Sequence, residues 1–146
     1  MKLKQFYLEF SRLSEYLKSL SLLFARLIVA YGFYEPAMMK WNDINSVAQW
    51  FGSIGIPLPL LNAYMAATTE IVGVVLLTLG FLTRAISIPL IVVMIVAIVT
   101  VHLPNGFSAG ENGYEIPLYY MIFLLMFLAH GAGRFSLDNL FLNKKE

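Results

Sequence analysis

The chain has 146 residues, of which 59% are hydrophobic and only 13% are charged, and its formal net charge is +1. An average soluble domain has about 25% charged residues, so this composition excludes an ordinary soluble protein and indicates a membrane protein. The small net charge, without a basic stripe, argues against nucleic-acid binding. The sequence contains no cysteine, which excludes disulfides and thiol catalysis by the chain itself.

The first 19 residues predict an amphipathic helix that lies on the membrane. Apolar residues recur at three- and four-residue steps, while charged residues occupy the other faces. The apolar set is Leu3, Phe6, Phe10, Leu13 and Leu17. Because the segment contains acidic residues and meets no small-residue cleavage site, we do not expect it to be a removable signal peptide.

Four apolar blocks follow, each near the ~20 residues that a membrane-spanning helix requires. They cover about residues 20–39, 59–82, 85–103 and 115–132. None alternates with a period of two, which argues against strands. We therefore predict an all-α fold in a single domain over residues 1–146, an integral membrane four-helix bundle with the N-terminal amphipathic interfacial helix and a tail at 133–146.

Two local features are predicted in addition to the four spans. Apolar residues in INSVAQWF predict a short interfacial helix at residues 44–51, in the loop after the first span. Pro36 falls late in the first span and frees the carbonyl of Gly32, which predicts a kink or an early helix end at that point.

The distribution of Lys and Arg predicts the orientation. Eight of them lie in the N-terminal segment, the turn at Arg84 and the tail, whereas the loops on the other side carry only Lys40. The positive-inside rule then places both termini in the cytoplasm, and we expect a bacterial-type plasma (inner) membrane.

Charged residues inside the membrane are candidates for a function. Glu70 is predicted about 15 Å below the outer end of the second helix, near the bilayer midplane, where a carboxylate is costly. Arg26 enters the first helix from the cytoplasmic side, and its long side chain makes it the expected partner of Glu70. Buried charged residues of this kind have two possible roles. They can neutralise one another and hold the helices of the bundle in register, or they can move protons or bind the polar head group of a ligand.

A second group of residues is predicted near the outer ends of the helices. Lys40, His102 and Glu115 are expected at one level, with Tyr119 one turn after Glu115 and Glu35 beside Pro36. Glu35, His102 and Glu115 lack the spacing of a zinc motif, so we predict no metal. His130 lies roughly 22 Å from the level of His102, so one haem cannot bridge the two histidines and we predict no haem.

The chain resembles the DoxX family of small four-helix membrane proteins over nearly all of residues 22–140. The similar elements are ARLIVAYGFYEPAMMKW, EIVGVVLLTLGFLTR, HLP with the downstream GYEIPL, and the closing GAGRFSLD. Family members often have histidine at the position of Glu35. The family is similar to DoxD, a membrane subunit of thiosulfate:quinone oxidoreductase, and some members are linked to oxidoreductase assemblies and thiol stress responses. The resemblance implies a redox setting.

From these observations we expect a membrane component of a quinone-linked oxidoreductase complex. Glu115 and His102 would exchange protons, Lys40 or Arg26 would stabilise negative charge, and Tyr119 would donate a hydrogen bond to the quinone. Glu35 and Glu70 complete the candidate ligand-binding set. Electrons would come from the cofactor of a soluble or peripheral redox partner.

Two alternatives stay open. The chain could be a noncatalytic membrane anchor or scaffold for a partner subunit, its charges holding the fold. It could also transport a small anion or protons, as a carboxylate at the midplane suggests. Whether the chain is an enzyme by itself, and whether it forms a homo-oligomer, is left undecided by the sequence.

Overall fold

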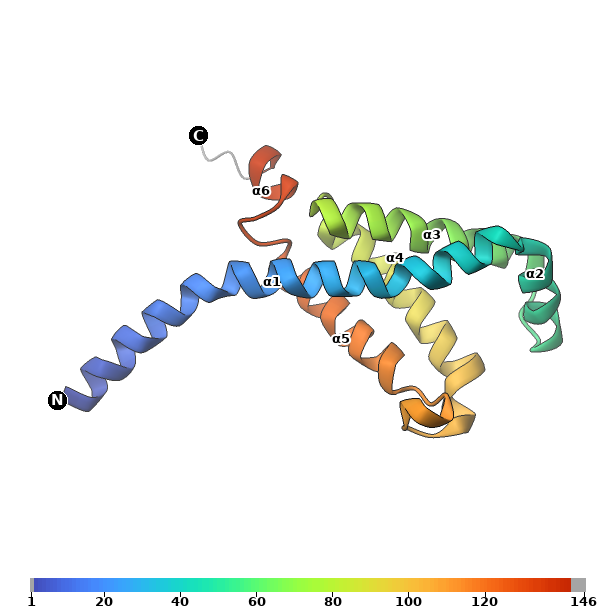
Figure 1. Cartoon of the computed structure of the whole chain (residues 1–146), viewed down its shortest axis with the longest axis horizontal. Coiled ribbons are helices and arrows are strands. Elements are labelled where there is room, and N and C mark those ends of the chain that lie inside the picture. The colour runs from blue at the N-terminus through green and yellow to red at the C-terminus, as the bar shows by residue number, and fades with distance from the viewer. Residues whose placement is uncertain (1, 143–146) are drawn as a thin grey trace.

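The computed structural model describes residues 2–142, and every regular element within this range is a helix or helical turn (Figure 1). The helices are α1 (Lys2–Asn42), α2 (Ile44–Ser53), α3 (Pro59–Leu79), α4 (Thr83–Ala97), α5 (Glu115–His130) and α6 (Leu137–Phe141). Three short turns connect α4 to α5: the π-helical η1 (Ile98–His102) and the 3₁₀ turns η2 (Leu103–Asn105) and η3 (Ala109–Glu111). The all-α prediction is confirmed. Lys144 and Lys145, which contribute to the predicted charge asymmetry, lie outside the described residues.

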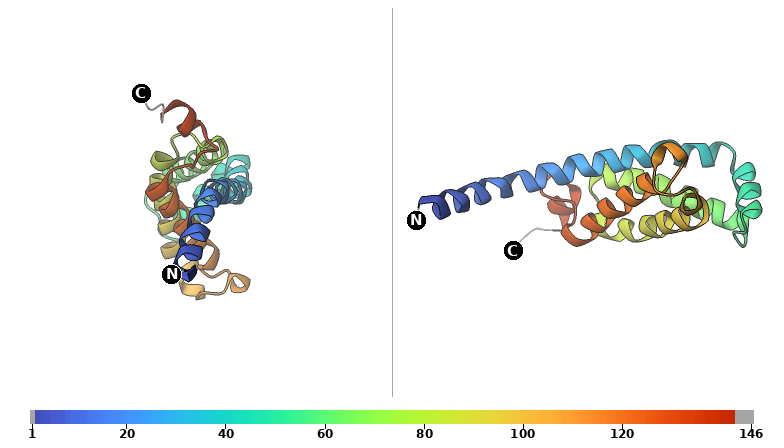
Figure 2. Two further views of the ribbon diagram at one scale, coloured as in Figure 1. Left: turned by 90° about the vertical axis from the view of Figure 1, so that its left-hand side faces the viewer. Right: turned by 90° about the horizontal axis from the view of Figure 1, so that it is seen from below.

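Helix α1 joins two segments that were predicted to be separate. It is one helix of 41 residues, and its N-terminal part projects away from the other helices (Figure 1, Figure 2). A separate helix over residues 1–19 is therefore wrong, because no glycine or proline interrupts residues 2–31 and nothing in the backbone ends the helix there. Pro36 does not end α1 either, since the helix continues to Asn42.

The long helices form two antiparallel pairs. Helices α1 and α3 lie side by side, and α4 and α5 form a second pair that crosses the first obliquely (Figure 1). The pairs approach each other near the turn between α3 and α4 and diverge toward α2 and the loop that precedes α5. The turn is tight, since Gly80 ends α3 with a φ of 65° and Leu82 precedes α4 with a φ of 48°.

One apolar core lies between the two pairs. Its most buried members come from α1, α3, α4 and α5, namely Val29, Phe33, Leu77, Leu90, Leu124 and Phe127. Gly73 brings α3 close to α4, because a Cβ at this position would lie 2.8 Å from Cδ1 of Leu90. A smaller cluster around Ala48, Phe51 and Ala63 holds α2 against the start of α3.

Helix α2 confirms the short helix predicted at residues 44–51. Asp43 caps it by accepting hydrogen bonds from the hydroxyl (2.6 Å) and the backbone N–H (3.1 Å) of Ser46. Both bonds stabilise the ionised form, so the pKa of Asp43 lies below its ordinary value. The stabilisation is present above the ordinary pKa of an aspartate and is lost as the pH falls through the lowered value.

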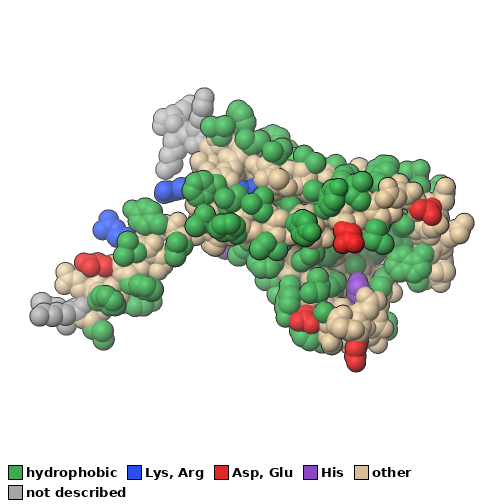
Figure 3. Space-filling model, viewed as in Figure 1, with side chains coloured by type: hydrophobic (Ala, Val, Ile, Leu, Met, Phe, Trp, Pro, Cys, Tyr) green, Lys and Arg blue, Asp and Glu red, His purple; other side chains and the backbone are tan. Residues whose placement is uncertain are grey.

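Among the described residues, three helical runs are long and apolar enough to cross a membrane. They are Leu3–Asn42, Pro59–Leu79 and Thr83–Asn105, whereas α5 is shorter, with 16 residues. Large apolar side chains cover the outside of these helices (Figure 3), and Ile28, Val75 and Val92 are each more than half exposed. Such a surface is stable against lipid rather than water.

Candidate functional site

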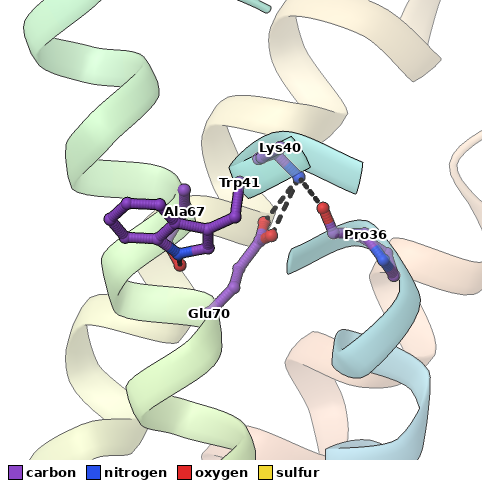
Figure 4. A network of polar contacts seen from close by, with 5 residues as sticks. All are labelled: Pro36, Lys40, Trp41, Ala67 and Glu70. Carbon is purple, nitrogen blue, oxygen red and sulfur yellow. Dashed lines mark hydrogen bonds and ion pairs between the residues drawn. The ribbon is translucent and has the colours of Figure 1, made fainter. Parts of the chain in front are cut away.

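An ion pair joins α1 to α3 where the helix pairs begin to diverge (Figure 4). The Nζ of Lys40 lies 2.8 Å from Oε2 and 3.1 Å from Oε1 of Glu70, so the ammonium group binds both carboxylate oxygens. The side chain of Glu70 is 3% exposed and that of Lys40 is 19% exposed. The carboxylate is thus buried in the protein and depends on Lys40 for its counter-charge.

Neighbouring contacts fix the position of this pair. The indole Nε1 of Trp41 donates to the carbonyl of Ala67 at 3.2 Å, about one turn of α3 before Glu70. Ala37 and Ala67 are completely buried, and their small side chains allow α1 and α3 to approach closely. Nζ of Lys40 also lies 3.4 Å from the carbonyl of Pro36.

The predicted pairing of Glu70 with Arg26 is wrong. Arg26 and Lys40 are fourteen residues apart on α1, which corresponds to about 21 Å along the helix. Since α3 runs antiparallel to α1, Glu70 is level with Lys40, whereas Arg26 is level with Leu77 near the end of α3. Hydrophobicity indicates the approximate ends of apolar helices but not the register between them, so the sequence could not select the correct partner.

Arg26 is completely buried and connects three parts of the chain. Its Nη1 donates to the carbonyl of Leu77 at 2.7 Å, and its Nη2 donates to the carbonyl of Phe135 at 2.6 Å, between α5 and α6. The carbonyl of Leu77 belongs to the last turn of α3, where a positive charge is favourable. The carboxylate of Asp138 adds a favourable charge. These contacts give Arg26 a structural role at the end of α3.

Asp138 was missed from the sequence, although it holds the same region together. Its carboxylate accepts hydrogen bonds from the backbone N–H of Leu82 (2.7 Å) and Thr83 (3.0 Å) and so caps α4. Leu82, the residue at the N-cap position, has no side chain that can do this. The sequence does show that α4 has no capping side chain of its own. It does not show which residue supplies the cap, because Asp138 is 55 positions away from Thr83.

A cavity of about 840 Å³ opens between the diverging helix pairs, with a predominantly apolar lining. Lys40, Glu70 and His102 line it, so the structure brings together three of the predicted site residues from α1, α3 and η1. The volume lies within the range of about 300–1,000 Å³ that is typical of small-molecule sites. Among the described residues, the other predicted members do not line this cavity: Arg26, Glu35, Glu115 and Tyr119.

His102 reaches the cavity from the π-helical turn η1. Its Nδ1 lies 2.9 Å from the carbonyl oxygen of Asn112. A carbonyl only accepts, so Nδ1 carries the hydrogen and Nε2 is the nitrogen left for a ligand. A π turn was not predicted, because the apolar run before His102 does not distinguish it from an α-helix. Such turns occur frequently at functional sites.

Glu115 and Tyr119 form a separate contact at the start of α5. Oε2 of Glu115 accepts a hydrogen bond from the N–H of Ala109 (2.9 Å), and Oε1 accepts one from the hydroxyl of Tyr119 (3.0 Å). These bonds hold η3 against α5, and Ala109 itself lines the cavity. Glu115 thus supports the wall of the cavity from outside, while Glu35 is exposed on α1.

Tyr120, rather than Tyr119, faces the cavity. Its ring centroid lies 5.5 Å from that of Phe33, and its hydroxyl occupies the space that a Cβ on Gly32 would fill. No hydrogen bond within the described residues engages this hydroxyl. Neighbouring residues of a helix differ by 100° in direction, and the sequence pattern does not fix the rotation of α5 that places Tyr120 rather than Tyr119 in the lining.

The lining of the cavity combines a few polar groups with a mostly apolar wall. Within residues 2–142, no three His, Asp or Glu side chains come together to hold a metal ion. The polar groups of the cavity are one ammonium, one carboxylate, one imidazole and hydroxyl or amide groups in a largely apolar wall. They suit an organic molecule with an apolar body and a polar head.

Comparisons with known proteins agree with this class. The DoxX family model matches residues 21–103. An uncharacterised protein of Haemophilus influenzae is 35% identical over 128 residues, which cover 82% of each chain. A Bacillus subtilis protein named "Putative oxidoreductase CatD" is 32% identical over 113 residues, 77% of this chain and 80% of its own. An uncharacterised membrane protein of Mycobacterium tuberculosis is 32% identical over 129 residues, 81% and 79% of the two chains. No solved structure matches.

The apolar helical runs and their lipid-compatible surface define an integral membrane protein of the small helical class. Within that class, the chain belongs to the DoxX family, as its resemblance in sequence predicted.

Proposed function

We propose that this protein is the membrane component of a redox complex and that its 840 Å³ cavity binds the head group of a quinone. The observation that carries the proposal is the Lys40–Glu70 ion pair, placed with His102 in a largely apolar cavity. A quinone has an apolar ring and tail and two carbonyl oxygens, so it suits an apolar wall with a few hydrogen-bond donors. One relative is named an oxidoreductase, which is in keeping with this role.

The geometry suggests a division of roles among the lining residues. The ammonium of Lys40 and the hydroxyl of Tyr120 would donate hydrogen bonds to quinone oxygens, and His102 would exchange a proton through Nε2. Glu70 is then a positioning residue that holds Lys40. Reduction of a quinone to a quinol takes up two electrons and two protons, and the electrons would come from the cofactor of a partner protein.

We also propose that α5 is a fourth membrane span and that both termini face the cytoplasm of a bacterial-type plasma membrane. The charge distribution supports this orientation. On the face seen in Figure 3, the Lys and Arg side chains lie toward the end of the molecule that carries both termini, and most acidic side chains lie toward the other end. The cavity would then open toward the outer leaflet.

The variant His102→Ala tests the proposed site. It should weaken the binding of a short-chain quinone about ten-fold, the effect of one lost hydrogen bond of about 1.4 kcal/mol. The melting temperature should scarcely change, because the one described hydrogen bond of His102 is to a loop carbonyl. Quinone affinity and melting temperature are measured on the purified protein in one detergent.

Glu115→Gln is the matched control for this experiment. Glutamine retains a side-chain oxygen that can accept the hydrogen bond from Ala109, and Glu115 does not line the cavity. Quinone affinity should therefore remain close to that of the wild type, in contrast to the role expected from the sequence. Equal affinity in His102→Ala and the wild type would contradict the site. Purification of the protein with a stoichiometric partner but without quinone would favour the scaffold function. Movement of protons or of a small anion into proteoliposomes that contain the protein would favour the transporter function.

A further inference from the structure

A second cavity, of about 950 Å³, lies at the opposite end of the molecule. It is formed by the N-terminal part of α1, the turn between α3 and α4, and the segment that follows α5, and it shares no lining residue with the first cavity. Four cationic side chains line it: Arg12, Lys18, Arg84 and Arg134. Two acidic side chains accompany them, but the carboxylate of Asp138 is engaged by the backbone of α4.

These cations form no ion pair with any carboxylate in the described part of the chain. No ion pair there involves Arg12, Lys18, Arg84 or Arg134, although each side chain is exposed and lines the same cavity. The side chain of Arg84 lies against Gly131, where an added Cβ would be 3.2 Å from Nε. Four gathered cations with only one uncommitted carboxylate create a positive potential that attracts an anion.

The cavity also lies at the edge of the apolar part of the molecule. Arg84 is the second residue of α4, and Arg134 follows the end of α5 by four residues. Both are therefore at the level where an apolar helix meets the lipid head groups. Leu22, Leu82 and Ala85 add apolar surface to the lining.

We propose that this cavity binds the phosphodiester group of an anionic glycerophospholipid such as phosphatidylglycerol. A guanidinium group can bind two phosphate oxygens at once, which makes Arg84 and Arg134 the principal contacts. The acyl chains of such a lipid would lie along the apolar helices, which a soluble phosphate compound could not use. Basic pockets at the ends of membrane helices bind lipid head groups in this way. The proposal does not depend on the quinone site.

The test is a titration of delipidated protein with phosphatidylglycerol or phosphatidylcholine in a neutral detergent, followed by native mass spectrometry. We expect wild-type protein to retain phosphatidylglycerol in preference to phosphatidylcholine. Arg84→Gln and Arg134→Gln should each weaken this binding about five-fold, as expected for one cation near a lipid head group. Lys4→Gln removes one cation from α1 outside the cavity and should leave the affinity unchanged.

Inorganic phosphate distinguishes a lipid from a free anion. If phosphate raises the melting temperature while phosphatidylglycerol does not bind, the site serves a soluble phosphate compound and the lipid proposal is overturned. Equal binding of the two lipids would also overturn the lipid proposal. So would equal losses of phosphatidylglycerol affinity in Lys4→Gln and Arg84→Gln. Lys18→Gln, on the exposed face of α1, replaces Arg84→Gln as the test variant if the latter does not fold, with the same expected loss.

Discussion

Replacement of Arg26 by methionine is expected to lower the free energy of unfolding by about 3–5 kcal/mol, the cost of breaking a buried charged network. Methionine fills a similar volume but donates no hydrogen bond. The carbonyls of Leu77 and Phe135 would both lose their bonds to the guanidinium, and the end of α3 would lose its positive charge. The loss would therefore loosen α3 and the segment before α6 together.

Two further variants separate this effect from a general loss of charge. Arg26→Lys should recover only part of the stability, because one ammonium group cannot reproduce the two hydrogen bonds that diverge from the guanidinium. Arg12→Met removes an exposed arginine from the same helix and should change the stability by less than about 0.5 kcal/mol. Unfolding in a mixed-detergent titration measures all three, and an Arg26→Met variant as stable as Arg12→Met would refute the structural role.

The second large effect is expected at Lys40 and Glu70. Lys40→Met leaves the carboxylate of Glu70, which is 3% exposed, without its counter-charge and should cost about 3 kcal/mol. Glu70→Leu should cost less, because Lys40 is 19% exposed and its ammonium can turn toward water. The double variant should be more stable than Lys40→Met alone, since it leaves no buried charge.

A double-mutant cycle measures this coupling in the same unfolding assay. We expect an interaction free energy of about 2 kcal/mol between Lys40→Met and Glu70→Leu. A parallel cycle between Arg26→Met and Glu70→Leu should be additive to within about 0.5 kcal/mol, because the two side chains have no common partner. Coupling in the second cycle and none in the first would restore the pairing predicted from the sequence and contradict the structure.

Two of the cations of α1, Arg26 and Lys40, bind α3 at two levels. Arg26 binds the end of α3 near the tight turn, and Lys40 binds α3 about fourteen residues further along α1. Between them the contact is apolar, through small residues such as Ala37 and Ala67 that allow close approach. This arrangement holds α1 and α3 as one rigid wall of the cavity, while α4 and α5 form the other wall.

The sequence was sufficient for the helical class and for the short helix α2. Apolar blocks of membrane-spanning length predict helices because each backbone group must be satisfied within the segment. The extent of α1 was not foreseen, since hydrophobicity changes near residue 20 while the backbone carries no signal to stop. The π turn at His102 was not foreseen either, because its side chains are those of an ordinary apolar helix.

For the site, residue types were easier to predict than partners. An intramembrane Glu70 and two cations on one face of α1 could be recognised as costly and hence paired. Which cation meets Glu70 depends on the register of α1 against α3, and which tyrosine faces the cavity depends on the rotation of α5. Both are properties of tertiary packing. The capping of α4 by Asp138 is equally non-local, so local helix rules could not find it.

Native mass spectrometry of gently extracted protein, after incubation with excess quinone, tests the central claim most directly. Ala97 lines the cavity at the end of α4, so Ala97→Phe should fill part of it, whereas Val99→Phe adds a ring at a residue that is 59% exposed and does not line the cavity. We expect bound quinone in the wild type and in Val99→Phe, and its loss from Ala97→Phe. Wild-type protein without quinone, or Ala97→Phe with the wild-type amount, would contradict the proposed site.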